Sequence, residues 1–244
     1  MTLTAGAYFV AGTDTEVGKT LTCAALLCAA ARLGWRTQAF KPVAAGCEYS
    51  VERQRWENSD AQLLAHYATQ QMPYEDLNPC ALPEACSPHI AAKRHAFTVN
   101  ASNLVSRIRD AVLTDVDWVL AEGAGGWFAP INDCETMADV AIGLGWPVIQ
   151  VVGLRLGCLN HALLTHRAIE SSGLPVAGWI ACQVDAHLPH VAENCAWLES
   201  QLSTPLLGMV PWLTRTEPHL AQSQDKHMTA LVERAADCLI SSFA

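Results

Sequence analysis

Short runs of apolar residues alternate with longer segments that mix alanine and leucine with polar residues along the 244-residue chain. The apolar runs predict strands at 8–11, 37–43, 117–121, 147–152, 176–181 and 206–210. The longer segments predict helices at 19–33, 60–69, 101–113, 160–171 and 228–241. Because helices separate most of the strands, the pattern predicts βαβ units. We therefore expect an α/β fold with a doubly wound, mostly parallel sheet and helices on both faces.

The chain has no internal repeat, low-complexity tract or obvious linker, so we expect a single domain over residues 1–244. Segment 78–88 holds three prolines and is predicted to be a loop. In open parallel sheets, ligands bind beyond the carboxyl ends of the strands. Chemistry is therefore expected in the segments that follow the predicted strands, at 12–20, 41–47, 122–127, 153–160, 182–185 and 211–213.

Composition and charge narrow the function. The chain is 51% hydrophobic and 16% charged, with a formal net charge of −9. Such an acidic surface repels a phosphate backbone, so nucleic acid is not an expected partner. No apolar stretch approaches the roughly 20 residues that span a bilayer, and the N-terminus lacks the basic region of a signal peptide. The ten cysteines form no C-x-x-C pair. We expect a cytoplasmic protein with reduced thiols, away from the membrane.

The strongest motif is the segment Gly12-Thr-Asp-Thr-Glu-Val-Gly-Lys-Thr20. It follows a predicted strand and opens a predicted helix, which is the context of a phosphate-binding loop. Lys19 would then reach the β- and γ-phosphates of ATP, and the Thr20 hydroxyl would bind Mg²⁺. The spacing differs from the usual G-x-x-x-x-G-K-[ST], because Gly12 lies one residue earlier and Thr13 occupies the first position.

Further motifs follow this loop in order along nearly the whole chain. They are Lys41-Pro-Val-Ala-Ala-Gly46, Asn58-Ser-Asp-Ala61, Ser87-Pro-His89, Glu122-Gly-Ala-Gly-Gly-Trp127, Val152-Gly153, Leu156-Gly-Cys-Leu-Asn-His-Ala162, Gly178-Trp179, Pro205-Leu-Leu-Gly208 and Pro211-Trp212. Together with the longer phosphate loop, they resemble the dethiobiotin synthetases, a family with the fold of the P-loop NTPases.

The resemblance implies an ATP- and Mg²⁺-dependent ligase of biotin biosynthesis. In that reaction, 7,8-diaminononanoate and CO₂ (or bicarbonate as its source) give dethiobiotin, ADP and phosphate. An amine takes up CO₂ as a carbamate, whose oxygen attacks the γ-phosphate to form a carbamic-phosphoric anhydride. The second amine then closes the ureido ring. The resemblance also implies a homodimer in which each active site receives a segment of the partner subunit.

The resemblance assigns roles to individual residues. The catalytic residues would be Lys41, Lys19 and Thr15. Mg²⁺ would be held by Thr20, Asp60 and Glu122. The diamine would contact Thr15, Lys41, Ala45 and, from the partner subunit, Gly157, Cys158, Leu159 and Asn160. ATP would be bound by Glu16, Val17, Gly18, Lys19, Thr20, Leu21, Asp60, Glu122, Gly123, Ala124, Gly125, Cys182, Gln183, Pro211, Trp212 and Leu213.

The sequence departs from the family pattern at three places. Ala45 stands where the family usually has a serine, so a hydroxyl is missing from the substrate side. Cys182 and Gln183 stand where an Asn-Asp pair usually follows the fifth strand, and the asparagine reads adenine. A tyrosine of the next helix is replaced by Asn194 or Trp197. We therefore expect weaker discrimination of ATP from other nucleoside triphosphates.

Three other classes fit part of the pattern. A phosphate-loop switch or partitioning ATPase would share the sheet, although many carry an extra lysine that residues 13–17 lack. An amidase-type ligase of the cobyrinate-synthesis group would need a further glutaminase domain. A binding module without catalysis would not need the combined set of Lys19, Thr20, Asp60 and Glu122.

Overall fold

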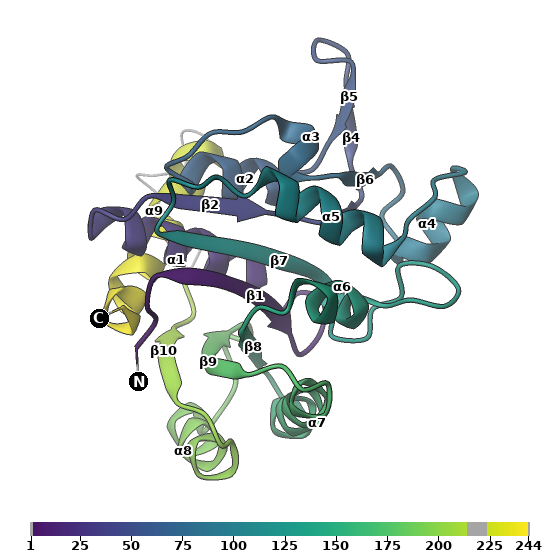
Figure 1. Cartoon of the computed structure of the whole chain (residues 1–244). Coiled ribbons are helices and arrows are strands. Elements are labelled where there is room, and N and C mark those ends of the chain that lie inside the picture. Colours follow the sequence, from purple (N-terminus) through teal and green to yellow (C-terminus); the bar gives the residue numbers. More distant parts are fainter. Residues whose placement is uncertain (1, 214–223, 244) are drawn as a thin grey trace.

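The computed structural model describes residues 2–213 and 224–243. Its centre is a six-stranded sheet in which every neighbouring pair is parallel (Figure 1). The strands run in the order β10 (Leu206–Val210), β9 (Val176–Gln183), β8 (Val148–Leu154), β1 (Gly6–Gly12), β7 (Trp118–Gly126) and β2 (Thr37–Phe40). Strand β1 lies between β8 and β7, so the phosphate loop leaves the sheet near its middle.

Helices cover both faces of this sheet (Figure 1). One face carries α1 (Lys19–Arg32), α2 (Ser59–Tyr67) and α9 (Gln224–Leu239). The other face carries α5 (Ala101–Ala111), α6 (Met137–Leu144), α7 (Cys158–Ser171) and α8 (Val191–Gln201). Successive residues of a strand point to opposite faces of the sheet. Val10 therefore packs in the hydrophobic core between the sheet and α1, whereas Phe9 packs in the core between the sheet and α5. The predicted doubly wound parallel fold is confirmed.

The strand predicted at 37–43 is wrong at its end. Strand β2 stops at Phe40, and residues Val43–Ala45 form a separate strand, β3, which pairs with β6 (Cys80–Leu82). The N–H of Lys41 does not continue the pairing of β2 but donates to the carbonyl of Leu77 at 2.8 Å. The next residue, Pro42, has no N–H with which to form a ladder hydrogen bond. Strand β6 also corrects the loop predicted at 78–88.

Several short elements were not predicted because their runs are too brief to show a period. These are α3 (Tyr74–Leu77), α4 (Pro88–Arg94), the 3₁₀ helix η1 (Ile240–Ser242) and the antiparallel hairpin of β4 (Glu48–Ser50) and β5 (Arg55–Glu57). The hairpin projects from the body of the protein near α3 (Figure 1). Helix α6 was missed as well, although a capping box of Thr136 and Asp139 marks its start.

All ten cysteines are free thiols in this structure. Across the two described ranges, no helix combines the length and the apolar character that crossing a membrane requires.

Candidate active site

A cleft of about 1500 Å³ opens at the carboxyl edge of the sheet. Its lining combines the phosphate loop, the ends of β2 and β7, the start of α2, and the segments after β9 and β10. This edge is where ligands were expected to bind, because the sheet was predicted to be parallel. Seventeen of the residues expected in the site line the cleft: Thr15, Glu16, Gly18, Lys19, Thr20, Leu21, Lys41, Ala45, Asp60, Glu122, Ala124, Gly125, Cys182, Gln183, Pro211, Trp212 and Leu213.

The phosphate loop has the backbone of an anion-binding turn. Glu16 (φ 57°) and Gly18 (φ 84°) are left-handed, and helix α1 begins directly after Gly18. Helix α1 has no side-chain cap and no acidic residue in its first turn. Its first N–H groups are therefore left for an anion in the cleft. A side chain at Gly18 would also be impossible, since a Cβ there would lie 2.3 Å from Sγ of Cys182.

Gly12, the early glycine of the motif, makes room for Lys19. The lysine side chain folds back across the loop and donates from Nζ to the main-chain oxygen of Asp14 at 2.8 Å. A Cβ at Gly12 would lie 2.7 Å from that Nζ. Burial lowers the pKa of Lys19, and Glu122 opposes this by favouring the charged ammonium.

A compact group of charges lies beside the loop. Lys41 Nζ is 2.6 Å from Oε1 of Glu122 and 3.0 Å from Oδ2 of Asp60. The Thr20 hydroxyl donates to the same Glu122 oxygen at 2.8 Å. Burial lowers the pKa of Lys41, but Glu122 and Asp60 outweigh this effect, so the pKa lies above its usual value and the ammonium stays charged.

Local structure explains how these four side chains meet. Lys41 directly follows β2, and its main-chain oxygen accepts from Nδ2 of Asn78 at 2.6 Å. Glu122 lies on the neighbouring strand β7 and has no exposed surface. Asp60 stands in the first turn of α2, where the side chain of Asn58 accepts from the N–H groups of Asp60 and Ala61.

The donor set suits Mg²⁺. Two carboxylates and a hydroxyl supply oxygen ligands, and Mg²⁺ completes its shell with phosphate and water oxygens. Oε2 of Glu122 is buried and has no hydrogen-bond partner, so one carboxylate oxygen is left for a cation. Within the described residues, no three His, Cys, Asp or Glu side chains gather around one point. The residues therefore fit a metal that arrives with a nucleotide rather than a closed protein cage.

The far end of the cleft contains few polar side chains. Cys182 is only 2% exposed, and burial raises the pKa of its thiol to about 11. Gln183 holds neighbouring segments together, because its Oε1 accepts from the N–H of Trp212 at 3.3 Å and its Nε2 donates to the carbonyl of Asp185 at 3.1 Å. Its amide is thus partly engaged within the protein, although Gln183 also lines the cleft.

Comparisons with known proteins agree with this geometry. A protein-family model described as an AAA domain matches residues 6–219. The ATP-dependent dethiobiotin synthetase of Cellvibrio japonicus is 45% identical over 217 residues, which cover 89% of this chain and 94% of that protein. The corresponding protein of Pseudescherichia vulneris is 46% identical over 211 residues, 86% of this chain and 87% of its own length.

The chain belongs to the ATP-dependent dethiobiotin synthetase family. The predicted resemblance is thereby confirmed, and the chain is an ATP-dependent enzyme of the ligase type.

Solved structures show the same fold at low identity. MinD of Pyrococcus horikoshii, a septum site-determining protein complexed with Mg-ADP, superposes with a TM-score of 0.53 at 15% identity and covers 96% of this chain and 95% of its own. FtsY of Thermotoga maritima gives a TM-score of 0.50 at 14% identity, covering 94% of this chain and 68% of its own. At these identities the likeness concerns the fold alone.

Six residues assigned by likeness to the synthetases lie outside the cleft lining. Val17 is buried against Gly153, where a Cβ would come within 2.8 Å of the valine, and Gly123 lies under Phe9. The segment Gly157–Asn160 starts helix α7 and does not line the cleft either. Ala45 does line it, and its carbonyl accepts from Nδ2 of Asn58 at 3.4 Å.

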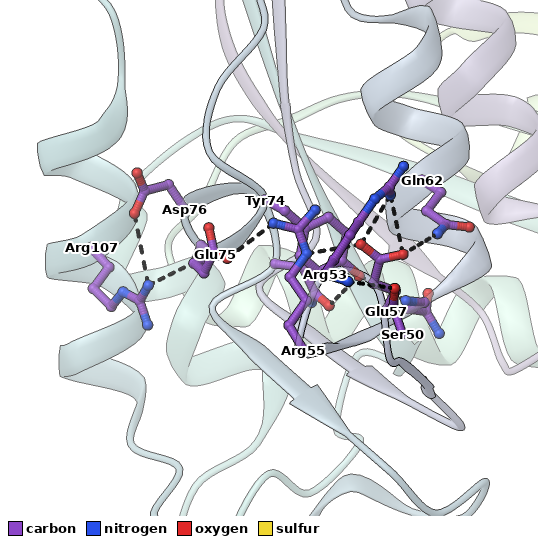
Figure 2. A network of polar contacts seen from close by, with 11 residues as sticks. Ser50, Arg53, Arg55, Glu57, Gln62, Tyr74, Glu75, Asp76 and Arg107 are labelled. Carbon is purple, nitrogen blue, oxygen red and sulfur yellow. Dashed lines mark hydrogen bonds and ion pairs between the residues drawn. The ribbon is translucent and has the colours of Figure 1, made fainter.

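The structure also brings in residues that sequence patterns did not single out. Asn78 holds the main chain of Lys41, and Arg155 pairs with Asp14 of the phosphate loop at 2.5 Å. Figure 2 shows a further support at the hairpin, where Glu57 accepts from Arg53, Arg55 and Gln62. Glu57 immediately precedes Asn58, so this network holds the start of the helix that carries Asp60. No sequence motif marks these contacts. Some of them join residues that are far apart in the chain, and the others join charged or polar residues of the kinds that are common on any protein surface.

Proposed function

We propose that the chain makes dethiobiotin from 7,8-diaminononanoate, CO₂ and ATP, releasing ADP and phosphate. The observation that carries the proposal is the contact of Lys41 with Glu122 and Asp60 inside a cleft that also holds the phosphate loop. This arrangement offers positive charge to a carbamate and a γ-phosphate at one place. The likeness to dethiobiotin synthetases over most of both chains supports the choice of substrate.

The proposed reaction has three steps. One amine nitrogen of the diamine attacks the carbon of CO₂ and loses a proton, which gives a carbamate. A carbamate oxygen then attacks the γ-phosphorus, and the bond from that phosphorus to the β-phosphate oxygen breaks, releasing ADP. The second amine attacks the carbonyl carbon, loses a proton and expels phosphate, which closes the ureido ring.

The protein acts mainly by positioning and by neutralising negative charge. Lys41 lies between the carbamate oxygen and the γ-phosphate, where its ammonium stabilises charge that develops during phosphoryl transfer. Lys19 leaves the carbonyl of Asp14 and contacts the β- and γ-phosphates. Thr15, at the mouth of the loop, approaches the diamine and its carbamate.

Thr20, Asp60 and Glu122 would hold Mg²⁺. The metal neutralises the phosphate oxygens when it is bound with ATP. Glu122 supplies its unpartnered oxygen without leaving Lys41, while the partly exposed Asp60 can turn from the lysine toward the cleft. Glu16, Gly18, Leu21, Ala124 and Gly125 contribute the loop surface around the nucleotide, and Cys182, Gln183 and residues 211–213 surround the base.

We also propose a homodimer in which residues 157–160 of the partner subunit bind the carboxylate of the diamine. The start of α7 has no side-chain cap and suits an anion, although the N–H of Cys158 donates to the carbonyl of Arg155 and residues 157–160 lie outside the cleft of their own chain. Leu156, which precedes them, is 93% exposed, and Leu164 on the same helix is also exposed. A second copy of the chain would cover these leucines.

The decisive experiment measures phosphate release from ATP with diaminononanoate and bicarbonate, each added alone and together. The proposal requires release that depends on both compounds and a product with the mass of dethiobiotin. Basal hydrolysis that ignores both and rises only with a protein partner would favour the switch ATPase instead.

The dimer has its own test. Sedimentation of the unchanged protein should give twice the chain mass, and Leu156→Glu should shift it to the monomer. A monomer that turns over at the full rate would contradict the shared site.

A further inference from the structure

Arg155 contacts the phosphate loop from outside the cleft. It stands in the turn between β8 and α7, and its Nη2 lies 2.5 Å from Oδ2 of Asp14. Asp14 lines the cleft, but Arg155 does not. The arginine therefore contacts the loop through Asp14 without itself lining the cleft.

Asp14 connects this arginine to the parts of the loop that bind phosphate. Its Oδ1 accepts from the N–H of Thr15 at 2.8 Å. Its main-chain oxygen accepts from Nζ of Lys19 at 2.8 Å. Asp14 thus holds the backbone before the left-handed turn, and its main-chain oxygen holds Lys19 until the lysine moves to the phosphates.

The turn itself needs support. Glu16 has φ 57°, in the left-handed region that a side chain with a Cβ disfavours. Such a conformation persists only where the surrounding contacts impose it. On the far side of Glu16, Val17 packs against Gly153. On the near side, the N–H of Thr13 donates to the carbonyl of Val151, and the Arg155–Asp14 pair holds the next residue.

We propose that Arg155 is a positioning residue, which acts through Asp14 to hold the phosphate loop in the conformation that binds nucleotide. The inference rests on the proposed function only in taking the ligand to be a nucleotide with Mg²⁺. It adds a residue that, unlike Lys41, Asp60 and Glu122, does not line the cleft.

The first test measures the Kd of Mg-ADP by calorimetry for the unchanged protein and for Arg155→Ala. We expect Kd to rise about fivefold, the upper range for an exposed ion pair. Arg155→Lys should keep part of the affinity, because the charge remains while the planar fork is lost. The matched control is Arg32→Ala. Arg32, at the end of α1, forms a similar surface ion pair at 2.7 Å with Asp237 of α9. The Kd of Mg-ADP for this variant should equal that of the unchanged protein.

Two further measurements separate positioning from a loss of structure. Asp14→Asn should raise Kd by a similar factor, and the double variant with Arg155→Ala should be no worse than either single change. In steady-state kinetics, KM for ATP should rise while kcat stays within about twofold of the unchanged enzyme. Effects that add in the double variant, or a fall in kcat with unchanged KM, would overturn the proposal.

A glycine background tests the link to the left-handed turn. Glycine adopts positive φ without strain, so Arg155→Ala should cost less affinity when it is added to Glu16→Gly than when it is made alone. An equal loss in both backgrounds would show that the arginine does not act through this turn, and the proposal would fail.

The Mg-ADP measurement is independent of the carboxylation reaction. If Arg155→Ala binds Mg-ADP as tightly as the unchanged protein while the diamine still drives phosphate release, the positioning role fails and the proposed function stands. If the diamine has no effect but Arg155→Ala weakens Mg-ADP binding, the reverse holds.

Discussion

The two ends of the cleft are built on different principles. At the phosphate end, Lys41, Glu122, Asp60 and Thr20 meet within 3.0 Å contacts, and Lys41 and Glu122 are buried. At the base end, a buried thiol and apolar side chains of Val184, Leu213, Met228 and Leu231 line the wall. Charge is thus concentrated where the bonds would change, and shape dominates where the base would lie. Substitutions at the two ends should therefore have very different effects.

The largest effect is expected at Lys41. Lys41→Met should lower kcat about 10²- to 10³-fold, because it removes a positive charge beside the transferred phosphoryl group. It should also lower the free energy of unfolding by about 3–5 kcal/mol, since Glu122 is left buried without its partner. Turnover and thermal unfolding measure the two effects.

A double variant separates the two losses. Adding Glu122→Gln to Lys41→Met removes the buried charge and should recover most of the stability, but turnover should stay low. If turnover returned with stability, Lys41 would have only a structural role.

The two carboxylates should differ in their effect on metal dependence. Glu122 has no exposed surface, whereas the Asp60 side chain is 42% exposed. Glu122→Gln should raise the Mg²⁺ concentration for half-maximal activity by more than about tenfold, as expected for a buried ligand. Asp60→Asn should raise it less, because water can replace an exposed oxygen. Equal shifts in Mg²⁺ titrations of the two variants would contradict this ranking.

Smaller effects are expected at the base end. Because the amide of Gln183 already bonds with Trp212 and Asp185, it is held by the protein and is a poorer reader of the base than a free asparagine would be. We expect kcat/KM for ATP, CTP and GTP to lie within about tenfold of one another, the range that apolar contacts discriminate. A strong preference for ATP that survives Gln183→Ala would show that the base is read by other groups.

The smallest effect concerns the Cys182 thiol. Its pKa of about 11 leaves little thiolate at pH 8, and the side chain is almost fully buried. An alkylating reagent at pH 8 should modify the exposed Cys134 first, while Cys182 should react only when the protein unfolds. Mass spectrometry of labelled peptides gives the order. Rapid labelling of Cys182 in the folded protein would mean that the base wall opens readily.

The elements with strong patterns were predicted closely. Helix α1 was expected at 19–33 and spans Lys19–Arg32, because its alanines and leucines continue to a left-handed glycine, Gly34. Strand β10 was expected at its observed bounds. The end of β2 was not predicted, because the apolar run continues to Val43 while the main chain of Lys41 turns to bond with Leu77.

The candidate site likewise contains residues that the sequence could place and contacts that it could not predict. Lys41 and Glu122 could each be placed after or within a strand, but their contact joins residues 81 positions apart and depends on the pairing of β2 with β7. The Arg155–Asp14 contact spans 141 positions, and although Asp14 belongs to the phosphate-loop motif, no pattern distinguishes Arg155 from a surface charge. Strand order decides such contacts, and hydrophobic periodicity does not encode strand order.

The position of β10 in the sheet has a consequence for how a nucleotide would leave. Residues 211–213 follow β10, which among the described strands pairs only with β9, whereas the phosphate loop follows β1, which is paired on both sides. A strand with one paired edge exchanges its amide hydrogens through smaller openings than a central strand does. The base would thus lose its wall through local fraying of β10 more readily than the phosphate loop would lose the strand from which it starts.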